Sequence, residues 1–357
     1  MFDPFRRLAR WRRRHPSLPL VGDIRTPAAR EAALLRATVK ALGAELARQR
    51  SDAGFAGPGA PVPAAGSVAL DGGLGGRVCR QADIEGDWLR YWCGRLGVAP
   101  AYHRKLWETC FVAQAAWEAG ALAPDRRVLG FAVGREPLPS LFAAHGAEVV
   151  ATDLPARDRR ARGWLRTGQH GGGGAASRAA LFRPDLLDAG AFDRSVAFRA
   201  VDMRRIPPDL LDGGFDLVWS ACAMEHLGGL GRGARFVLDA MRCLRPGGLA
   251  VHTTEFNLDA AGGTLRRGET VLFQRRHLDA LARRLAEAGH EMLPLDDRPG
   301  EGALDGFVDM PPYDGAEAAR SGFPPPHLRL SIGGFPVTSV GIVARAGEKQ
   351  RRNVSTW

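Results

Sequence analysis

The sequence predicts an α/β protein built on a doubly wound sheet of about seven strands, mostly parallel, with an antiparallel C-terminal hairpin and a helical N-terminal extension. From residue 127 onward, short apolar runs alternate with helical patterns, which is typical of parallel strands with helices on both faces. The last two runs are joined only by residues 333–337, which is enough chain for a hairpin but not for a parallel crossover. In residues 27–50, Ala and Leu recur at helical spacing, which predicts the extension.

The expected strands are seven short apolar runs. Their brevity and composition are typical of strands that are buried on both sides. Helical patterns separate most of them, including one around residues 276–288 after the fifth run. The runs are residues 128–131, 149–152, 197–201, 217–220, 249–253, 328–332 and 338–344.

Composition divides the chain into five parts. Residues 1–50 form a basic, partly helical N-terminal extension, and residues 51–77 are so rich in Gly, Ala and Pro that we predict a linker. Residues 78–124 are the helical N-terminal part of the main domain, which covers residues 125–347 and is followed by a tail at 348–357. Four tryptophans in residues 83–120 lie at helical spacing and are expected in the core: Trp88, Trp92, Trp107 and Trp117.

The net charge of +10 is concentrated near the amino end. Residues 1–50 contain twelve Lys or Arg and four Asp or Glu, so the rest of the chain is nearly neutral. We therefore expect no nucleic-acid partner. Within residues 1–15, Phe5, Leu8 and Trp11 lie at helical spacing among arginines. This segment is either an amphipathic helix on an anionic membrane or a disordered basic tail.

The cysteine pattern and the hydropathy limit the kinds of site and the cellular locations that we expect. Five widely spaced cysteines without a CxxC pair argue against a disulfide framework and against a zinc site, so no metal is expected. No apolar run approaches the roughly 18 residues of a membrane span, and the arginine-rich start lacks the apolar stretch of a secretion signal. We expect a cytoplasmic protein, with peripheral contact at the inner membrane face as the alternative that residues 1–15 leave open.

A turn of small residues follows the first strand of the main domain. The segment Val128-Leu-Gly-Phe-Ala-Val-Gly-Arg-Glu-Pro-Leu-Pro139 leads from strand to helix, and its small residues let backbone approach a cofactor closely. Asp153 follows the next strand, nineteen residues after Gly134, where a carboxylate can accept both hydroxyls of a ribose. A nicotinamide-binding domain offers much the same arrangement, so these features leave the cofactor open.

Three later segments bear on the choice of cofactor. The segment Phe198-Arg-Ala-Val-Asp-Met-Arg-Arg-Ile-Pro207 places Asp202 after the third strand. The fourth strand leads into a loop through Phe215-Asp-Leu-Val-Trp-Ser-Ala-Cys-Ala-Met-Glu-His-Leu227. A helix, a Pro-Gly-Gly turn and the fifth strand are predicted from Met241-Arg-Cys-Leu-Arg-Pro-Gly-Gly-Leu-Ala-Val251.

In this order, the motifs resemble those of class I S-adenosylmethionine-dependent methyltransferases over about residues 125–255, and through the final hairpin to about residue 345. The turn Gly-x-Glu-Pro-Leu-Pro and the segment His-Thr-Thr-Glu-Phe-Asn257 resemble a bacterial, type 11/12-like branch that is associated with glycan pathways. The resemblance implies a Rossmann-like fold, S-adenosylmethionine as cofactor, and Asp202 at the adenine amino group. The residues expected to bind the cofactor are Gly130, Ala132, Gly134, Glu136, Asp153, Leu154, Asp202, Met203 and Ser220.

The turn departs from the family pattern at three positions. Gly130 stands where an acidic residue is usual, Ala132 where a glycine is usual, and Glu136 at the place of a third glycine. Ala132 permits close approach only with a negative φ, because its methyl group makes positive φ costly. Glu136 either contacts the methionine part of the cofactor or is an ordinary charge at a helix amino terminus. These departures keep a non-catalytic methyltransferase fold open.

Polar side chains follow the fourth and fifth strands. Glu225 and His226 are the candidate catalytic residues, and His226 acts either as a general base or as an anchor of its loop. A base is needed only for a hydroxyl or a protonated amine, since methyl transfer itself is an in-line displacement. The candidate acceptor-binding residues are His252, Glu255, Asn257, Gln169 and His170, of which His252 is also a candidate for a structural role inside its strand.

Forty-eight residues separate Asp153 from Asp202, which is more than a simple crossover needs. The excess includes Trp164 and the glycines 171–174, and it is either a lid that carries Gln169 and His170 or a surface insertion. No second ligand lies at helical spacing from His170, so this segment does not predict a metal site.

The sequence thus favours a methyltransferase that acts on a small molecule or a glycan, by O-methylation. An NAD(P)-dependent oxidoreductase and a non-catalytic binding protein remain the alternatives. The oligomeric state stays open.

Overall fold

The computed structural model describes residues 26–52, 62–64, 68–313 and 324–348. The segment 1–15 and the part of the tail from residue 349 onward lie outside the described residues, as does most of the predicted linker between residues 53 and 67.

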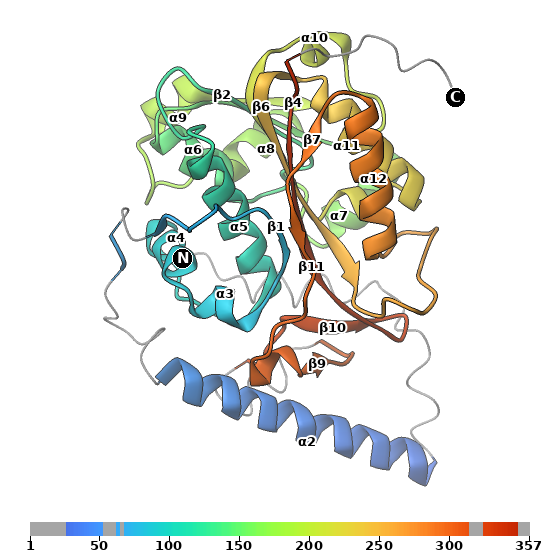
Figure 1. Ribbon diagram of the computed structural model, residues 1–357. Helices are drawn as coiled ribbons and strands as arrows, with labels where there is room; N and C mark the ends of the chain where they lie inside the picture. The colour runs from blue at the N-terminus through green and yellow to red at the C-terminus, as the bar shows by residue number, and fades with distance from the viewer. Residues whose placement is uncertain (1–25, 53–61, 65–67, 314–323, 349–357) are drawn as a thin grey trace.

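The centre of the molecule is one twisted mixed sheet (Figure 1). Its main path runs in the order β4-β3-β2-β5-β6-β11-β1-β8, and β7, β9 and β10 pair at its margins. Strands β2 to β6 run parallel to one another, whereas β11 runs antiparallel to β6 and to β10. The strands are β1 (Gly76–Val78), β2 (Arg127–Gly130), β3 (Glu148–Asp153), β4 (Val196–Ala200), β5 (Phe215–Ala221), β6 (Leu244–Asn257), β7 (Glu291–Met292), β8 (Leu295–Asp296), β9 (Val308–Asp309), β10 (Arg329–Ile332) and β11 (Phe335–Arg345).

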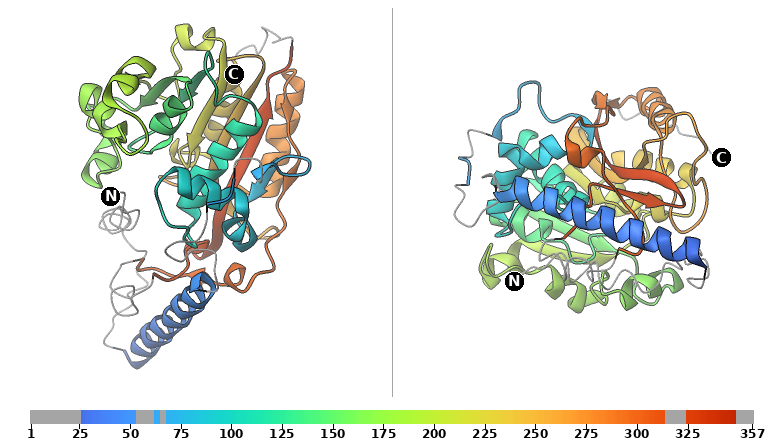
Figure 2. Two further views of the ribbon diagram at one scale, coloured as in Figure 1. Left: turned by 90° about the vertical axis from the view of Figure 1, so that its left-hand side faces the viewer. Right: turned by 90° about the horizontal axis from the view of Figure 1, so that it is seen from below.

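Helices cover both faces of this sheet (Figures 1 and 2). One apolar cluster joins α3 to α6 to one face, and a second joins α10 to α12 to the other. The predicted α/β fold with its antiparallel C-terminal hairpin is therefore confirmed. The helices are α2 (Pro27–Arg50), α3 (Gln81–Glu85), α4 (Asp87–Arg95), α5 (Arg104–Glu118), α6 (Leu138–Ala144), α7 (Arg162–Arg166), α8 (Gly174–Leu181), α9 (Ala189–Ser195), α10 (Pro208–Leu211), α11 (Leu230–Met241) and α12 (Arg275–Glu287).

The tryptophans of the N-terminal part of the domain pack in the core, as expected. Trp92 and Trp107 are completely buried, and each indole N–H donates to a buried side chain, Gln114 and Asp83 respectively. Trp117 is only partly buried. Helix α5 thereby lies firmly against β5, β6 and β11, which fixes the position of its amino-terminal turn.

The predicted linker differs from the structure at its carboxyl end. Val68 and Leu74 are buried, and Gln114 donates to the Val68 carbonyl. Strand β1 then pairs with β11 and β8, so residues 68–78 belong to the sheet region. The composition could not predict that residues 68–78 are part of the domain, because backbone hydrogen bonds rather than a run of apolar side chains hold this segment. Strands β7, β8 and β9 were not predicted either, since two residues carry no periodicity.

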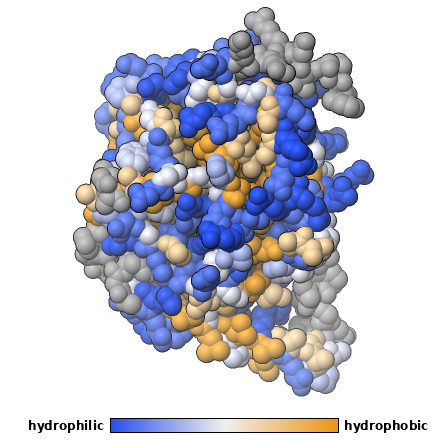
Figure 3. Space-filling model, viewed as in Figure 1, coloured by the Kyte–Doolittle hydropathy of each residue, from blue (hydrophilic) through white to orange (hydrophobic). Residues whose placement is uncertain are grey.

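The predicted N-terminal helix is α2, which lies along the lower side of the molecule in Figure 1. Its small residue Gly43 lies against Phe307, whose ring would collide with a Cβ there at 2.4 Å. The buried Lys40 ammonium lies 3.1 Å from Asp309 Oδ1 and donates to the Pro312 carbonyl at 2.7 Å. The outer face is apolar, and orange side chains gather along this edge in Figure 3. The exposed large apolar residues of this helix are Leu34, Leu35, Val39 and Leu42.

Among the helices that the structure describes, none combines the length and the apolarity that crossing a membrane requires.

Candidate functional site

The carboxyl ends of β2 to β6 meet at one edge of the sheet, and the chain order reverses between β2 and β5. Ligands of open α/β sheets bind at such a switch point, outside the strand ends. Both groups of motif residues follow these ends, so the fold brings the predicted cofactor and acceptor regions to one edge. A shallow hollow lined by Arg127, Glu148 and Ser195 lies at the opposite, amino-terminal edge.

The turn after β2 keeps a glycine-like backbone although it contains Ala132. The φ of Ala132 is 52°, so the negative φ that we set as the condition for close approach at this residue is not adopted. An L-residue in this left-handed region costs about 1–2 kcal/mol. Gly134 adopts a similar φ of 54°. The turn thus has the backbone form of a glycine-rich loop, at the expense of local strain.

Two of the departures from the family motif are explained together by Trp219. Gly130 pairs directly with Trp219 of β5, and a Cβ at residue 130 would lie 2.3 Å from the indole ring. The indole N–H donates to Glu136 Oε1 at 2.9 Å. Gly130 is therefore required by a buried tryptophan, and Glu136 holds that tryptophan. This contact gives Glu136 a role different from the two that the sequence suggested.

Asp153 ends β3 beside this turn and is only 7% exposed. Its Oδ1 accepts from the Leu154 N–H at 2.7 Å, and its Oδ2 lies 3.8 Å from His170 Nε2. His170 in turn bonds to the Leu154 carbonyl at 2.6 Å. Burial raises the pKa of Asp153, and His170 opposes that rise. The structure thus places His170 with the predicted ribose-binding residue rather than with the acceptor-binding group.

Asp202 follows β4 and is paired with two arginines. Arg160 lies 2.8 Å from Asp202 Oδ2, and Arg204 lies 3.5 Å from the same oxygen. Partial burial by itself would raise the pKa of Asp202. The hydrogen bonds from Arg160 and Arg204 outweigh this effect and lower the pKa to about 2. Asp202 therefore carries a negative charge at the end of the edge that follows β4. A ligand amino group there would compete with Arg160.

The segment between Asp153 and Asp202 is folded and lies over the strand ends. The Gln169 carbonyl oxygen would lie 2.6 Å from a Cβ on Gly134, so the segment touches the turn after β2. From α7, Trp164 places its ring 4.7 Å from that of His226, edge to face. The segment therefore contacts both the predicted cofactor turn and the candidate base. These contacts favour the lid interpretation over a surface insertion.

Three other predicted residues are directed into the protein rather than toward the edge. Ser220 and His252 are completely buried and bond to each other, with Oγ and Nδ1 2.8 Å apart. The His252 ring lies against Phe236 of α11, and burial lowers its pKa to about 3. Met203 is 7% exposed within the apolar cluster on the α11 side. The neutral His252 is therefore a structural residue of β6.

The edge beside β5 and β6, which we call the acceptor side after its predicted role, contains five charged residues: Arg104, Lys105, Glu108, Glu225 and Glu255. We call them the buried charge cluster, because all of them except Lys105 are buried. Arg104 is its centre, with Nη2 2.7 Å from Glu255 Oε1 and Nη1 3.1 Å from Glu108 Oε1. Lys105, partly exposed, lies 3.1 Å from Glu108 Oε2. Charged groups are rarely buried unless they are paired. The pairs of Glu108 with Arg104 and Lys105 lie within α5, whereas the pair of Arg104 with Glu255 joins α5 to β6.

Strand register brings this cluster together. Glu255 of β6 lies opposite Ser339 of β11, and Ser339 donates to Glu108 of α5. Burial by itself would raise the pKa of Glu108, but the charges of Lys105 and Arg104 hold this pKa below its usual value. Burial raises the pKa of Glu255, which Arg104 opposes. Sequence reasoning found Glu255 but missed Arg104 and Glu108, whose i, i+4 spacing on an otherwise buried helix was the available signal.

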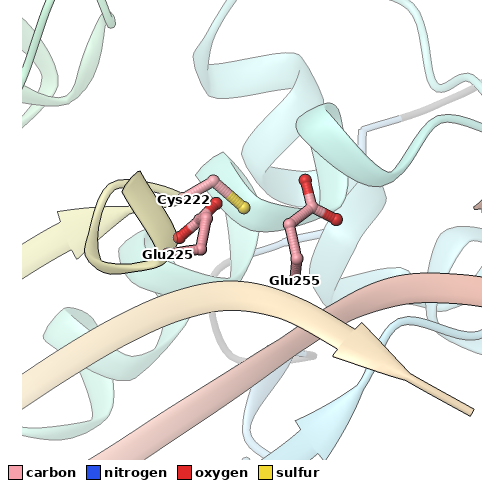
Figure 4. Close-up of side chains that lie close together, drawn as sticks. All are labelled: Cys222, Glu225 and Glu255. Atoms are coloured by element: carbon pink, nitrogen blue, oxygen red, sulfur yellow. The ribbon is translucent and has the colours of Figure 1, made fainter. Parts of the chain in front are cut away.

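Glu225 and Cys222 complete the acceptor side (Figure 4). Glu225 Oε2 accepts from Thr254 Oγ1 at 3.0 Å, and burial raises the pKa of this carboxyl. Cys222 has a φ of 45°, and its partly buried sulfur is 4.0 Å from Arg104 Nη1. Figure 4 shows the sulfur between the carboxyl groups of Glu225 and Glu255. Sequence reasoning missed Cys222, although it lies in the same loop as Glu225.

His226 lies at the border between the two sides. Its Nδ1 is 2.8 Å from the Glu269 carbonyl, so Nδ1 is the protonated donor of the neutral ring. Its Nε2 then carries the lone pair and lies 3.8 Å from Glu225 Oε1. Burial lowers the pKa of His226, which keeps the ring neutral. The two interpretations of His226 are therefore compatible, because the loop anchor also orients the candidate base.

Asn257 is the predicted acceptor residue that turns away from the cluster. It is 1% exposed, its Nδ2 donates to the Gly263 carbonyl, and its Oδ1 accepts from the Asp259 N–H. These bonds hold its own loop. The structure therefore brings Glu225, His226 and Glu255 together and leaves Asn257 outside.

Comparisons with known proteins agree with this geometry. The family model described as a methyltransferase domain matches residues 129–252, from β2 into β6. No match to a curated protein is found.

The similar solved structures are distant. A candidate sarcosine dimethylglycine methyltransferase from Galdieria sulphuraria shares 15% identity at a TM-score of 0.42, over 74% of this chain and 99% of that one. The magnesium protoporphyrin IX methyltransferase from Synechocystis with bound SAH shares 12% at 0.40, over 68% and 83%. The 1,6-didemethyltoxoflavin-N1-methyltransferase from Burkholderia thailandensis shares 15% at 0.40, over 68% and 78%. Such likeness carries no information about the substrate.

The strand order and the matching family model agree on one conclusion: residues 129–252 are similar to a methyltransferase domain, and the fold is the Rossmann-like one that the resemblance to class I methyltransferases implies.

Proposed function

We propose that this protein transfers a methyl group from S-adenosylmethionine to a hydroxyl group of a small molecule or glycan. The observation that carries the proposal is the position of two sets of residues at one sheet edge. Asp153 and Asp202 lie at the ends of β3 and β4, and the buried charge cluster lies beside β5 and β6.

The cofactor side fits the nucleoside of S-adenosylmethionine. Asp153 is buried next to the Gly134 turn, which suits a carboxylate that binds ribose hydroxyls. Asp202 presents an anion for the adenine amino group once Arg160 moves aside. The bound cofactor would supply an electrophilic methyl group. The residues of the turn and of the 163–174 segment hold it in place and exclude water.

The acceptor side fits a polar substrate. Buried carboxylates such as Glu225 and Glu255 can accept hydrogen bonds from hydroxyl groups, which are abundant on sugars. His226 offers an unprotonated Nε2 at the border between cofactor and acceptor, which suits a general base for a hydroxyl. Trp164 covers this ring and limits the access of water.

A non-catalytic role has its own support in the strained Ala132 and in the Gln169 carbonyl packed on Gly134. Either feature could restrict access to the turn. Cofactor binding therefore separates the two functions directly.

The test is calorimetric titration of the full chain with S-adenosylmethionine, S-adenosylhomocysteine and nicotinamide dinucleotides. We expect saturable binding of the first two at micromolar affinity, about −8 kcal/mol, and no binding of a dinucleotide. Binding of a dinucleotide alone would favour an oxidoreductase. No binding at all would favour a non-catalytic protein.

The acceptor is tested by the release of S-adenosylhomocysteine in the presence of sugars and other hydroxyl compounds. Release that requires a hydroxyl acceptor supports O-methylation. Release only with amines that lack hydroxyl groups would contradict it.

A further inference from the structure

Three potential metal ligands converge on the acceptor side of the edge. Cys222, Glu225 and Glu255 each offer one ligand atom, and the three atoms lie within 4.8 Å of one another. Cys222 and Glu225 come from the loop after β5, and Glu255 comes from β6, so two neighbouring elements bring them together. In Figure 4 the sulfur lies between the two carboxyl groups.

Each of the two carboxylates has one oxygen available. Glu225 Oε1 and Glu255 Oε2 are buried and have no hydrogen-bond partner among the residues that the structure describes. Leaving such an atom unsatisfied costs about 1–3 kcal/mol, and more for a charged group. These two atoms therefore indicate a ligand that the protein itself does not supply.

The other oxygen of each carboxylate is held by the protein. Thr254 donates to Glu225 Oε2, and Arg104 pairs with Glu255 Oε1. Such contacts behind a ligand fix its orientation, and they are a regular feature of metal sites. Arg104 therefore positions Glu255 without occupying its second oxygen.

The local charges also favour a cation. The buried charge cluster contains three carboxylates and two cations, Arg104 and Lys105, so one negative charge is in excess when all five are ionised. Burial and the nearby carboxylates raise the pKa of the Cys222 thiol, so it would lose its proton only on binding a metal ion, and the excess would then be two. A divalent ion would then neutralise the whole group.

We propose that Cys222, Glu225 and Glu255 bind one divalent metal ion with the ligand preferences of Zn²⁺. A thiolate with two carboxylates suits Zn²⁺, whereas Mg²⁺ and Ca²⁺ select oxygen ligands only. Metal binding deprotonates the Cys222 thiol, and the proton passes to solvent. Three protein ligands leave a fourth position for water or for an acceptor oxygen.

The experiment uses the full chain after treatment with a chelator, titrated with Co²⁺ as a visible substitute for Zn²⁺. We expect one equivalent to bind, with a thiolate-to-cobalt charge-transfer band and the strong d–d bands of a tetrahedral ion. Zn²⁺ should displace the cobalt, and Mg²⁺ should not. Failure to bind one equivalent, or binding without the thiolate band, overturns the proposal.

Variants assign the ligands. Cys222→Ser should abolish the charge-transfer band, and Glu255→Gln should weaken Co²⁺ binding by at least about 10-fold. The matched control is Cys243→Ala. Cys243 is buried in the apolar cluster that contains α10 to α12, so its replacement should leave the spectrum unchanged. An unchanged spectrum in Cys222→Ser excludes the site.

Glu255→Gln keeps the size of the side chain and still tests the site if Cys222→Ser does not fold. Titration of the same samples with S-adenosylhomocysteine separates this proposal from the proposed function. Metal binding without cofactor binding leaves only the metal proposal standing, and the reverse leaves only the methyltransferase.

Discussion

The cofactor side and the acceptor side of the same sheet edge are assembled in different ways. On the cofactor side, the turn 130–136, Asp153 and Asp202 each follow directly from one strand and the loop after it. On the acceptor side, Arg104, Glu225, Glu255 and Ser339 come from four elements that are distant in the sequence. The cofactor side is therefore formed by local sequence motifs, and the acceptor side by packing between elements that are distant in the sequence. This difference explains why the sequence described the cofactor side more completely.

The largest effect should come from removing the centre of the acceptor side. Arg104→Met leaves Glu255 and Glu108 buried without their partner, so we expect the free energy of unfolding to fall by about 3–5 kcal/mol in urea titrations. Arg48→Met is the matched control, because Arg48 pairs with Glu45 and Asp52 on the exposed surface of α2 and should matter little. Equal effects of the two changes would mean that the cluster does not stabilise the fold.

An intermediate effect is expected on the cofactor side, where Asp153→Ala removes the proposed ribose contacts. The affinity for S-adenosylhomocysteine should fall at least 10-fold, which corresponds to about 1.4 kcal/mol, as measured by calorimetry. Asp193→Ala is the control, since that side chain is 65% exposed beside the amino-terminal edge of the sheet. Unchanged affinity in the Asp153 variant would remove this residue from the cofactor site.

The smallest effect should appear in the turn itself. Ala132→Gly relieves a positive φ, and part of that gain is lost to the greater freedom of glycine in the unfolded chain, so we expect stabilisation by about 0.5–1 kcal/mol. Ala151→Gly in β3 is the control, because glycine in a regular strand should destabilise by about 0.5–1 kcal/mol. The signs of the two changes, measured by thermal or urea unfolding, test whether Ala132 is strained. Destabilisation by Ala132→Gly would contradict this account.

The sequence predicted the seven main strands, the hairpin and the helices at 27–50 and 276–288, because their apolar periodicity is long enough to be recognised. It did not predict β1, β7, β8 or β9, which are held by backbone pairing over two or three residues. It also could not assign Gly130 and Glu136, because both depend on the Trp219 ring from a neighbouring strand. A pattern along one segment carries no information on its neighbour across the sheet.

What the sequence alone determined is the α/β class and the order of strand-end motifs, since hydrophobic periodicity and turn residues act over a few positions. Only the tertiary structure decided which polar residues share an environment. It placed His170 with Asp153, turned Asn257 and His252 away, and joined Arg104 to Glu255. It also brought Cys222 close to Glu225 and Glu255, three residues whose spacing in the sequence does not match a metal-binding motif. The physical reason is that strand register and helix packing bring together residues that are far apart in the sequence.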